Sequence, residues 1–227
     1  MAATKITCSD TWALCGIAVP IVFATLVTVA GYFYQDYSHV TQAVSELGGV
    51  EAQYPVLQNV NFAVIGLLLI AFSIGLYRGF GVTYHGPVFI GVFGVVSALH
   101  AVLPCDPGCD FQTLTGTLHN ATGLAGFLAA IAGIFLVSRY LNTDSQWRSL
   151  SRFSWMAGVV VLVSLVLWIG VAKAADVGSL NGVLQRVFIL SWFVWVEVMA
   201  IRLFRISRGQ SFISEARSVI KTGARVN

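Results

Sequence analysis

Residues 56–77 read VLQNVNFAVIGLLLIAFSIGLY, a run of 22 residues without a charged side chain. A helix rises about 1.5 Å per residue, so this run is long enough to cross a hydrocarbon layer of roughly 30 Å. Five further apolar runs of similar length occupy residues 12–33, 82–103, 118–137, 153–171 and 183–204. The sequence therefore predicts an all-α membrane protein, a single domain over residues 1–227 built as a bundle of six transmembrane helices.

The composition agrees with a chain surrounded by lipid. Of its 227 residues, 57% are hydrophobic and 10% are charged, and the mean hydropathy is +0.80. A water-soluble domain carries about a quarter charged residues, so this chain has too few to cover a surface that faces water. The net charge is only +3, and we expect membrane lipids rather than nucleic acid as its partners.

The basic residues predict the orientation in the membrane. The N-terminus, the second and fourth connections and the C-terminal segment together hold 11 of the 13 Lys and Arg residues. Cytoplasmic segments of membrane proteins are enriched in Lys and Arg, so both termini and a basic tail, residues 205–227, are predicted to be cytoplasmic. The other three connections then face outward, and they contain Asp36, Glu46, Glu51, Asp106, Asp110 and Asp176.

Two segments outside the spans have a helical pattern. Val40, Val44 and Leu47 are spaced as one face of a helix that ends at Gly48, which predicts a short helix on the outer surface. In the tail, a stripe of apolar residues beside Arg217 and Lys221 predicts either an amphipathic helix on the inner leaflet or a solvated, frayed end.

Glycines predict that the third and fourth spans pack tightly as a hairpin. Small residues allow two helices to approach closely, and both spans carry three of them, namely Gly86, Gly91, Gly94, Gly123, Gly126 and Gly133. Such a hairpin would bring His100 close to His119.

Short polar strips recur at the predicted outer ends of the spans. Residues three or four apart share a helix face, as Ser97 with His100 and His119 with Thr122 do. Polar groups at membrane depth turn toward the protein interior or a cavity. We therefore predict an outward-facing pocket, and ordinary hydrogen bonding between packed helices is the alternative. Its predicted ligand-binding residues are His39, Gln58, Asn61, Asn120 and Arg186, and Asn181 and Gln185 form a further strip just before Arg186.

The third connection reads LPCDPGCD over residues 103–110. Proline and glycine favour a tight turn, and Cys105 and Cys109 lie four apart on the predicted oxidising side, which favours a disulfide. A metal site built from these thiols with His100 or His119 is the alternative.

Clustered histidines and carboxylates also suggest an enzyme. His39, His100 and His119 could hold zinc with Asp106 or Asp110 and leave a bound water to be activated, and His100, His119 and Asp106 are the predicted ligand set. Ser45 and Glu46 would complete the catalytic set as polarising or substrate-binding groups.

Several of these residues stand in motifs of a known family. The sequences SELG at 45–48, LPCD at 103–106 and LHN at 118–120 resemble domain-of-unknown-function family 998, whose members are six-span membrane proteins of prokaryotes. The resemblance implies that Ser45, Glu46, Asp106, His119 and Asn120 act together. The layout is more remotely similar to alkaline-ceramidase-like membrane hydrolases, which place a Ser, an Asp and several His around zinc. Those proteins have seven spans and a late histidine pair, whereas this sequence has no histidine after His119.

These observations lead to three functional hypotheses. The pocket would take a lipid or another amphipathic small molecule, in a lipid hydrolase or lipid-modifying enzyme. Alternatively, the chain binds, senses or transports such a molecule without chemistry. In the third hypothesis it is a membrane scaffold without a ligand.

Overall fold

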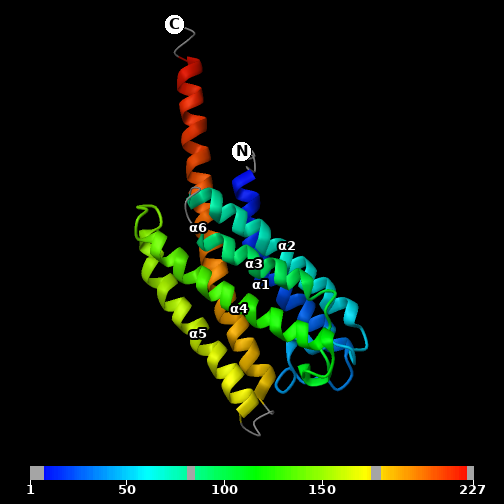
Figure 1. Cartoon of the computed structure of the whole chain (residues 1–227). Coiled ribbons are helices and arrows are strands. Elements are labelled where there is room, and N and C mark those ends of the chain that lie inside the picture. The colour runs from blue at the N-terminus through cyan, green and yellow to red at the C-terminus, as the bar shows by residue number, and fades with distance from the viewer. Residues whose placement is uncertain (1–7, 81–84, 175–179, 224–227) are drawn as a thin grey trace.

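The computed structural model describes residues 8–80, 85–174 and 180–223, and the side chains of 10–80, 85–170 and 180–209. Within these ranges the chain forms six α-helices, which confirms the all-α prediction (Figure 1). They are α1 (Cys8–Phe33), α2 (Pro55–Phe80), α3 (Gly86–Leu99), α4 (Leu114–Leu141), α5 (Ser151–Ala174) and α6 (Asn181–Gly223). Three short 3-10 turns lie in the connections: η1 (Val44–Gly48), η2 (Pro107–Cys109) and η3 (Arg148–Leu150).

Five of the described helices are long and apolar enough to cross a membrane, and α3 is shorter. Its 14 residues extend about 21 Å, less than a typical hydrocarbon core. Within the described part of the predicted third span, residues 85–103, the helix covers 86–99. The first residues of the predicted span, 82–84, lie outside the described ranges, and the chain turns at His100 and continues as a loop.

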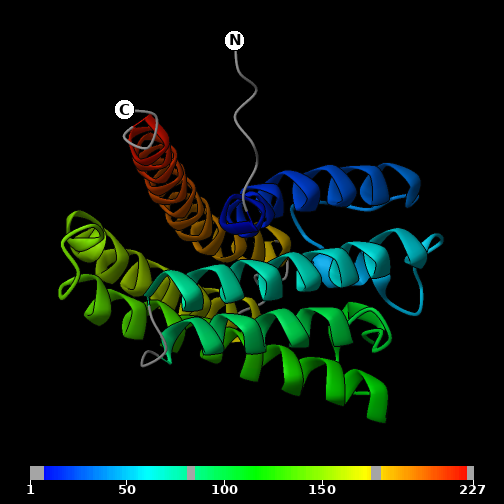
Figure 2. The same cartoon turned by 90° about the horizontal axis from the view of Figure 1, so that it is seen from above.

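The helices form a ring in sequence order, because each packs on the next and α6 returns to pack on α1 (Figures 1 and 2). The ring is filled by large buried side chains. Trp192, Trp195 and Phe188 of α6 meet Phe72 and Leu69 of α2 in one continuous core. Trp195 donates its indole N–H to the hydroxyl of Ser154 at 2.9 Å, so this buried polar atom on α6 is bonded to α5.

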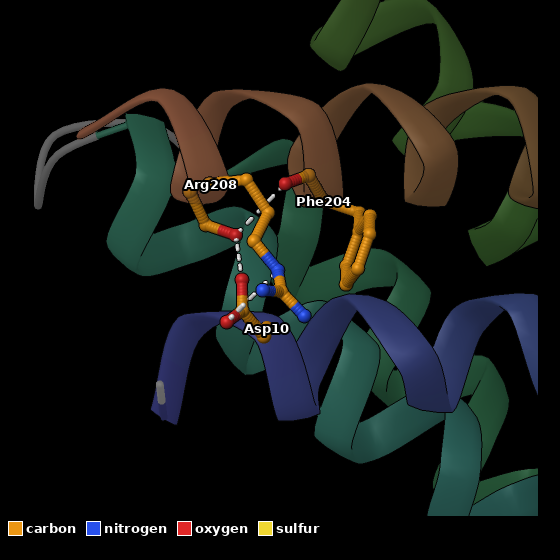
Figure 3. Close-up of polar contacts among 4 residues, drawn as sticks. Asp10, Phe204 and Arg208 are labelled. Atoms are coloured by element: carbon orange, nitrogen blue, oxygen red, sulfur yellow. Dashed lines mark hydrogen bonds and ion pairs between the residues drawn. The ribbon is translucent and has the colours of Figure 1, made fainter. Parts of the chain in front are cut away.

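The start of α1 contacts the middle of α6. Asp10, with a fully buried side chain, lies 3.5 Å from Nε of Arg208 and accepts a hydrogen bond from Ser207 (Figure 3). Ser207 and Arg208 belong to α6, so this contact closes the ring between the first and last helices. Burying an aspartate is costly unless it is paired and hydrogen-bonded, and here it has both kinds of partner.

The arginines gather at one end of the bundle and most of the described carboxylates at the other, with Asp10 and Asp144 at the arginine end. Both termini lie at one end, where α2 ends and α4 connects to α5 (Figure 1). Seven described arginine side chains lie at this end: Arg78, Arg139, Arg148, Arg152, Arg202, Arg205 and Arg208. The opposite end holds the α1–α2 and α3–α4 connections with Asp36, Glu46, Glu51, Asp106 and Asp110, and its described basic side chain is Arg186.

The two predicted surface segments have different outcomes. The helix expected over residues 40–48 is a five-residue 3-10 turn, in which Val44 and Leu47 are buried while Val40 is 48% exposed. The α1–α2 loop thus folds inward rather than presenting a regular amphipathic face. In the tail, α6 continues without a break to Gly223, and the predicted apolar stripe lies outside the described side chains (Figure 1).

The predicted glycine hairpin is correct in part. A Cβ on Gly133 of α4 would lie 3.1 Å from the carbonyl oxygen of Gly86 on α3, so these two helices approach closely there. Gly94 faces the other way, because a Cβ there would lie 2.8 Å from the carbonyl oxygen of Gly66 on α2. The glycines of α3 therefore allow close packing against both α4 and α2.

Candidate functional site: a histidine-lined cavity at the acidic end

A cavity of about 230 Å³ lies at the acidic end of the bundle, between the α3–α4 connection, α5 and the start of α6. Its walls are mainly apolar and include Phe127 and Trp168. Polar atoms come from four separate segments. The lining residues are Ala43, Ser45, His100, Gly108, Cys109, Phe111, His119, Asn120, Gly123, Leu124, Phe127, Trp168, Ile169, Asn181 and Gln185.

A narrower space of about 70 Å³ adjoins it toward the core and shares Ser45, His100, Phe127 and Gln185 with it. Its other walls are almost entirely apolar: Phe23, Val44, Phe62, Ile65, Phe93, Ser97, Ile189, Trp192 and Phe193. Together the two spaces place polar groups at the outer part and aromatic side chains at the inner part, as an amphipathic molecule requires.

The predicted approach of His100 and His119 is confirmed. Their rings stack with centroids 4.2 Å apart and planes inclined by 22°. Nδ1 of His119 lies 2.6 Å from the carbonyl oxygen of Leu103, and Nε2 of His100 lies 3.2 Å from the carbonyl oxygen of His119. A carbonyl only accepts, so each of these nitrogens carries the hydrogen. Nδ1 of His100 and Nε2 of His119 are thereby left with lone pairs, and neither is hydrogen-bonded within the described residues.

Ser45 is positioned in the cavity lining by a contact between η1 and α6. The amide of Gln185 is buried; its Oε1 accepts from the backbone N–H of Val44 at 2.5 Å, and its Nε2 lies 3.4 Å from Oγ of Ser45. The sequence predicts a polar strip of Asn181 and Gln185, but these two residues are not among the predicted ligand-binding residues. Both residues line the cavity.

Asp106 holds the start of α4. Its carboxylate accepts hydrogen bonds from the backbone N–H groups of Gln112 and Thr113, at 2.9 and 2.8 Å, and from the Thr113 hydroxyl at 2.8 Å. Thr113 is the N-cap of α4 and accepts in turn from the N–H of Gly116. The hydrogen bonds from Thr113 and Gln112 lower the pKa of Asp106, although burial opposes them. A Cβ on Gly116 would lie 2.0 Å from this carboxylate, so glycine is required there.

Asn120 also supports the loop while lining the cavity. Its amide donates to the backbone oxygens of Cys109 and Asp110, at 3.0 and 3.3 Å. The turn it holds contains Gly108 at φ 65°, a conformation that glycine adopts without strain. Asn120 therefore positions the wall that contains Cys109.

Arg186 and His39 lie beside the cavity rather than in its lining. The guanidinium of Arg186 donates to the carbonyl oxygens of His39, Gln42 and Gly182 at 2.8–3.0 Å, and to the hydroxyl of Tyr37 at 2.7 Å. Burial and the nearby Arg186 lower the pKa of His39. These contacts fasten the α1–α2 loop to α6, and their geometry leaves the predicted ligand-binding roles untested.

Three more predicted site residues are placed away from the cavity lining. Glu46 accepts from the backbone N–H of Ala43 at 2.6 Å, and burial raises its pKa. Gln58 and Asn61 are fully buried on α2 and hydrogen-bond to each other at 3.2 Å. Nε2 of Gln58 and Oδ1 of Asn61 have no hydrogen-bond partner within the described residues.

Cys105 and Cys109 are joined as a disulfide. Within the described residues, these two sulfurs and His119 form the group whose potential ligand atoms lie within 4.8 Å of one another. Sulfurs that are bonded to each other are not available as thiolates, so the group can hold a metal only after reduction. The predicted zinc set of His100, His119 and Asp106 stays a prediction, and in it Asp106 would have to leave its hydrogen bonds at the start of α4.

Residues 17–202 match the family described as "Protein of unknown function (DUF998)". The chain belongs to this family. The match includes every predicted site residue, so the cavity, the stacked histidines and the Asp106 cap all lie within the DUF998 region. No curated protein and no solved structure matches the chain.

Proposed function

We propose that this DUF998 protein crosses the cell membrane six times, with both termini in the cytoplasm, and binds a lipid or another amphipathic small molecule in an outward-facing cavity. The orientation is supported by the arginines gathered at the end where the termini lie. An even number of crossings agrees with termini at one end. α3 then completes its crossing with the loop residues that flank it.

The observation that carries the binding proposal is the composition of the cavity. His119, Asn120 and Asn181 line only the larger, outer cavity, while Phe127 continues into the apolar inner space beside Phe93 and Trp192. A polar headgroup can hydrogen-bond to the first set, and an acyl or prenyl chain can pack against the second. A scaffold without ligand is supported less well, because its acidic end would be fully packed.

Hydrolysis or modification of a lipid remains the second candidate function. It is supported by the two histidine nitrogens with lone pairs and by the hydroxyl of Ser45 in the same lining. However, no described residue that lines the cavity is an aspartate or a glutamate, and both Asp106 and Glu46 are bound to backbone N–H groups. Binding without chemistry is therefore the better supported proposal.

Filling the cavity tests binding. Leu124 of α4 lines the cavity, whereas Leu128, one turn further along the same helix, does not. Leu124→Trp should weaken binding of a lysophospholipid with a fluorescent acyl chain by about tenfold or more, and Leu128→Trp should leave it unchanged. The measurement is fluorescence anisotropy with the protein in nanodiscs. Equal affinities for the wild type and both variants would place the probe elsewhere and contradict the proposal.

The orientation has its own test. Glu51 and Ser145 are exposed residues in connections at opposite ends of the bundle. A membrane-impermeant maleimide should label Glu51→Cys in intact cells, and should label Ser145→Cys only after the cells are opened. The unsubstituted chain gives the background labelling. The reverse pattern would place the cavity on the cytoplasmic side.

A further inference from the structure

A second cavity, of about 160 Å³, lies at the opposite, basic end of the bundle. It is formed where the start of α1, the end of α2 and α6 meet, and the connection before α5 closes one side. The lining residues are Trp12, Gly75, Arg78, Gly79, Trp147, Leu203, Ile206 and Ser207. None of them belongs to the cavity at the acidic end.

Arg78 gives this cavity a positive charge that the described chain does not neutralise. Its guanidinium lies 5.5 Å from the centre of the Trp12 ring, and it makes no hydrogen bond or ion pair with any described residue. No described residue that lines the cavity is an aspartate or a glutamate, and Asp10, which binds the lining residue Ser207, is paired with Arg208 (Figure 3). The five N–H donors of Arg78 are therefore available to an anion.

Trp12 supplies a second donor. Its indole nitrogen is buried and has no hydrogen-bond partner within the described residues. A buried N–H without a partner costs free energy, so an acceptor at this position would be stabilising. Trp147 is 1% exposed and forms another wall of the cavity. Indole side chains are typical of the headgroup layer of a membrane, where one side of the ring is apolar and the other is polar.

We propose that this cavity binds a phosphate group, with Arg78 as the charged donor and Trp12 as the neutral one. Guanidinium groups bind phosphate oxygens through two parallel hydrogen bonds, which favours a phosphate over a simple halide. Basic pockets between membrane helices bind the headgroups of anionic lipids on the cytoplasmic side. A phospholipid headgroup and free phosphate share this chemistry, and the experiment below separates them.

The test uses the full chain in nanodiscs, which contain phosphatidylcholine alone or phosphatidylcholine with fluorescently labelled phosphatidylglycerol. Energy transfer from the protein to the labelled lipid reports binding. Arg78→Gln should lower the apparent affinity for phosphatidylglycerol by about tenfold, the contribution of one charged hydrogen-bonded pair. Trp12→Phe, which keeps the aromatic ring but removes the N–H, should lower it by about threefold.

Arg205→Gln is the matched control. Arg205 is an exposed arginine at the same end of the bundle that does not line the cavity, so this variant removes the same charge. It should leave the affinity within about twofold of wild type. Equal losses in Arg78→Gln and Arg205→Gln would show only general attraction between a basic surface and an anionic membrane, and the proposed site would be wrong.

Inorganic phosphate, added to the protein in phosphatidylcholine nanodiscs and followed by calorimetry, distinguishes the two sources. Binding of inorganic phosphate that Arg78→Gln abolishes would identify free phosphate as a ligand of the site. Binding of phosphatidylglycerol alone, with the same dependence on Arg78, would identify the lipid headgroup. Binding of neither probe in the wild type would overturn the proposal, and the cavity at the acidic end would be unaffected by that result.

Discussion

The carboxylate of Asp10, at the start of the first helix, lies 3.5 Å from Nε of Arg208 on the last helix. Asp10 is fully buried, whereas the Arg208 side chain is 33% exposed. A carboxylate at this depth is stable because the cation and the Ser207 hydroxyl are both in place (Figure 3). The contact joins positions that are 198 apart in the sequence, so it reports directly on closure of the ring.

Removing the cation from this pair should destabilise the fold. Arg208→Gln removes the Arg208 charge from beside buried Asp10, and we expect a loss of about 2 kcal/mol in the free energy of unfolding. Asp10→Asn should cost about 1 kcal/mol, and the double variant should cost less than the sum of the two. Unfolding of the purified protein in mixed detergent micelles measures these values. Arg205→Gln is the control, and additive losses would show that Asp10 and Arg208 are not coupled.

The hydrogen bonds of Asp106 predict that the stability of the fold depends on pH. Hydrogen bonds from Thr113 and Gln112 lower its pKa in the folded state, so the carboxylate stabilises the fold above the usual aspartate pKa of about 3.9. This stabilisation is lost as the pH falls through the lower, folded-state pKa. Melting temperatures of the wild type should therefore exceed those of Asp106→Asn at neutral pH, and the two should converge below about pH 4. Asp110→Asn, a change at an exposed neighbour, should follow the wild type throughout.

Replacement of Arg186 by lysine should destabilise the protein. A lysine has one ammonium group and cannot reproduce the fork that reaches Tyr37, His39 and Gln42 together. We expect Arg186→Lys to lower the free energy of unfolding by about 2 kcal/mol and to expose residues 34–43 to proteolysis. Arg205→Lys is the control for the exchange itself. Unchanged stability together with weaker ligand binding would instead favour the ligand-binding role that the sequence suggests for Arg186.

The disulfide closes a very short loop, so its contribution should be moderate. Loop-closure entropy gives about 2 kcal/mol for a separation of four residues. Reduction, or replacement of both Cys105 and Cys109 by serine, should lower the melting temperature by several degrees. Cys15→Ser, at a free thiol, should leave it unchanged. Identical melting curves with and without reductant would show that the bond does not constrain the loop.

The sequence predicts the helices well because apolar length alone determines them. Five of the six predicted runs coincide with long apolar helices, and their ends differ from the prediction by a few residues except at the continuous end of α6. The third run is different because the apolar pattern continues past His100, whereas the helical backbone ends at Leu99. Pro104, Pro107 and the hydrogen bonds of Asp106 favour a loop, so the helix ends before residue 103.

The site is harder to predict because a membrane helix has apolar residues on both its inner and outer faces. Spacing shows that Gln58 and Asn61 share a helix face, and that His119 and Thr122 share another. It does not show which helix faces contact each other in the bundle. The structure brings His100 to His119 and turns Gln58 and Asn61 into the core, away from the cavity lining. Similarly, nothing in the local sequence shows that Asp106 holds the N-cap residue Thr113 rather than facing the cavity, because its partners at positions 112 and 113 depend on the path of the loop.

Because α6 lies between α5 and α1, the ring can close only after the other five helices have been made. Until α6 is inserted, Asp10 has neither Arg208 nor Ser207 beside it, and the cavity at the acidic end lacks the wall that carries Gln185. A nascent chain that stops after α5 would thus lack both of these contacts of Asp10 and would leave the side of α1 that packs on α6 uncovered. Insertion of α6 therefore completes the contact at the basic end and the cavity wall at the acidic end in a single step.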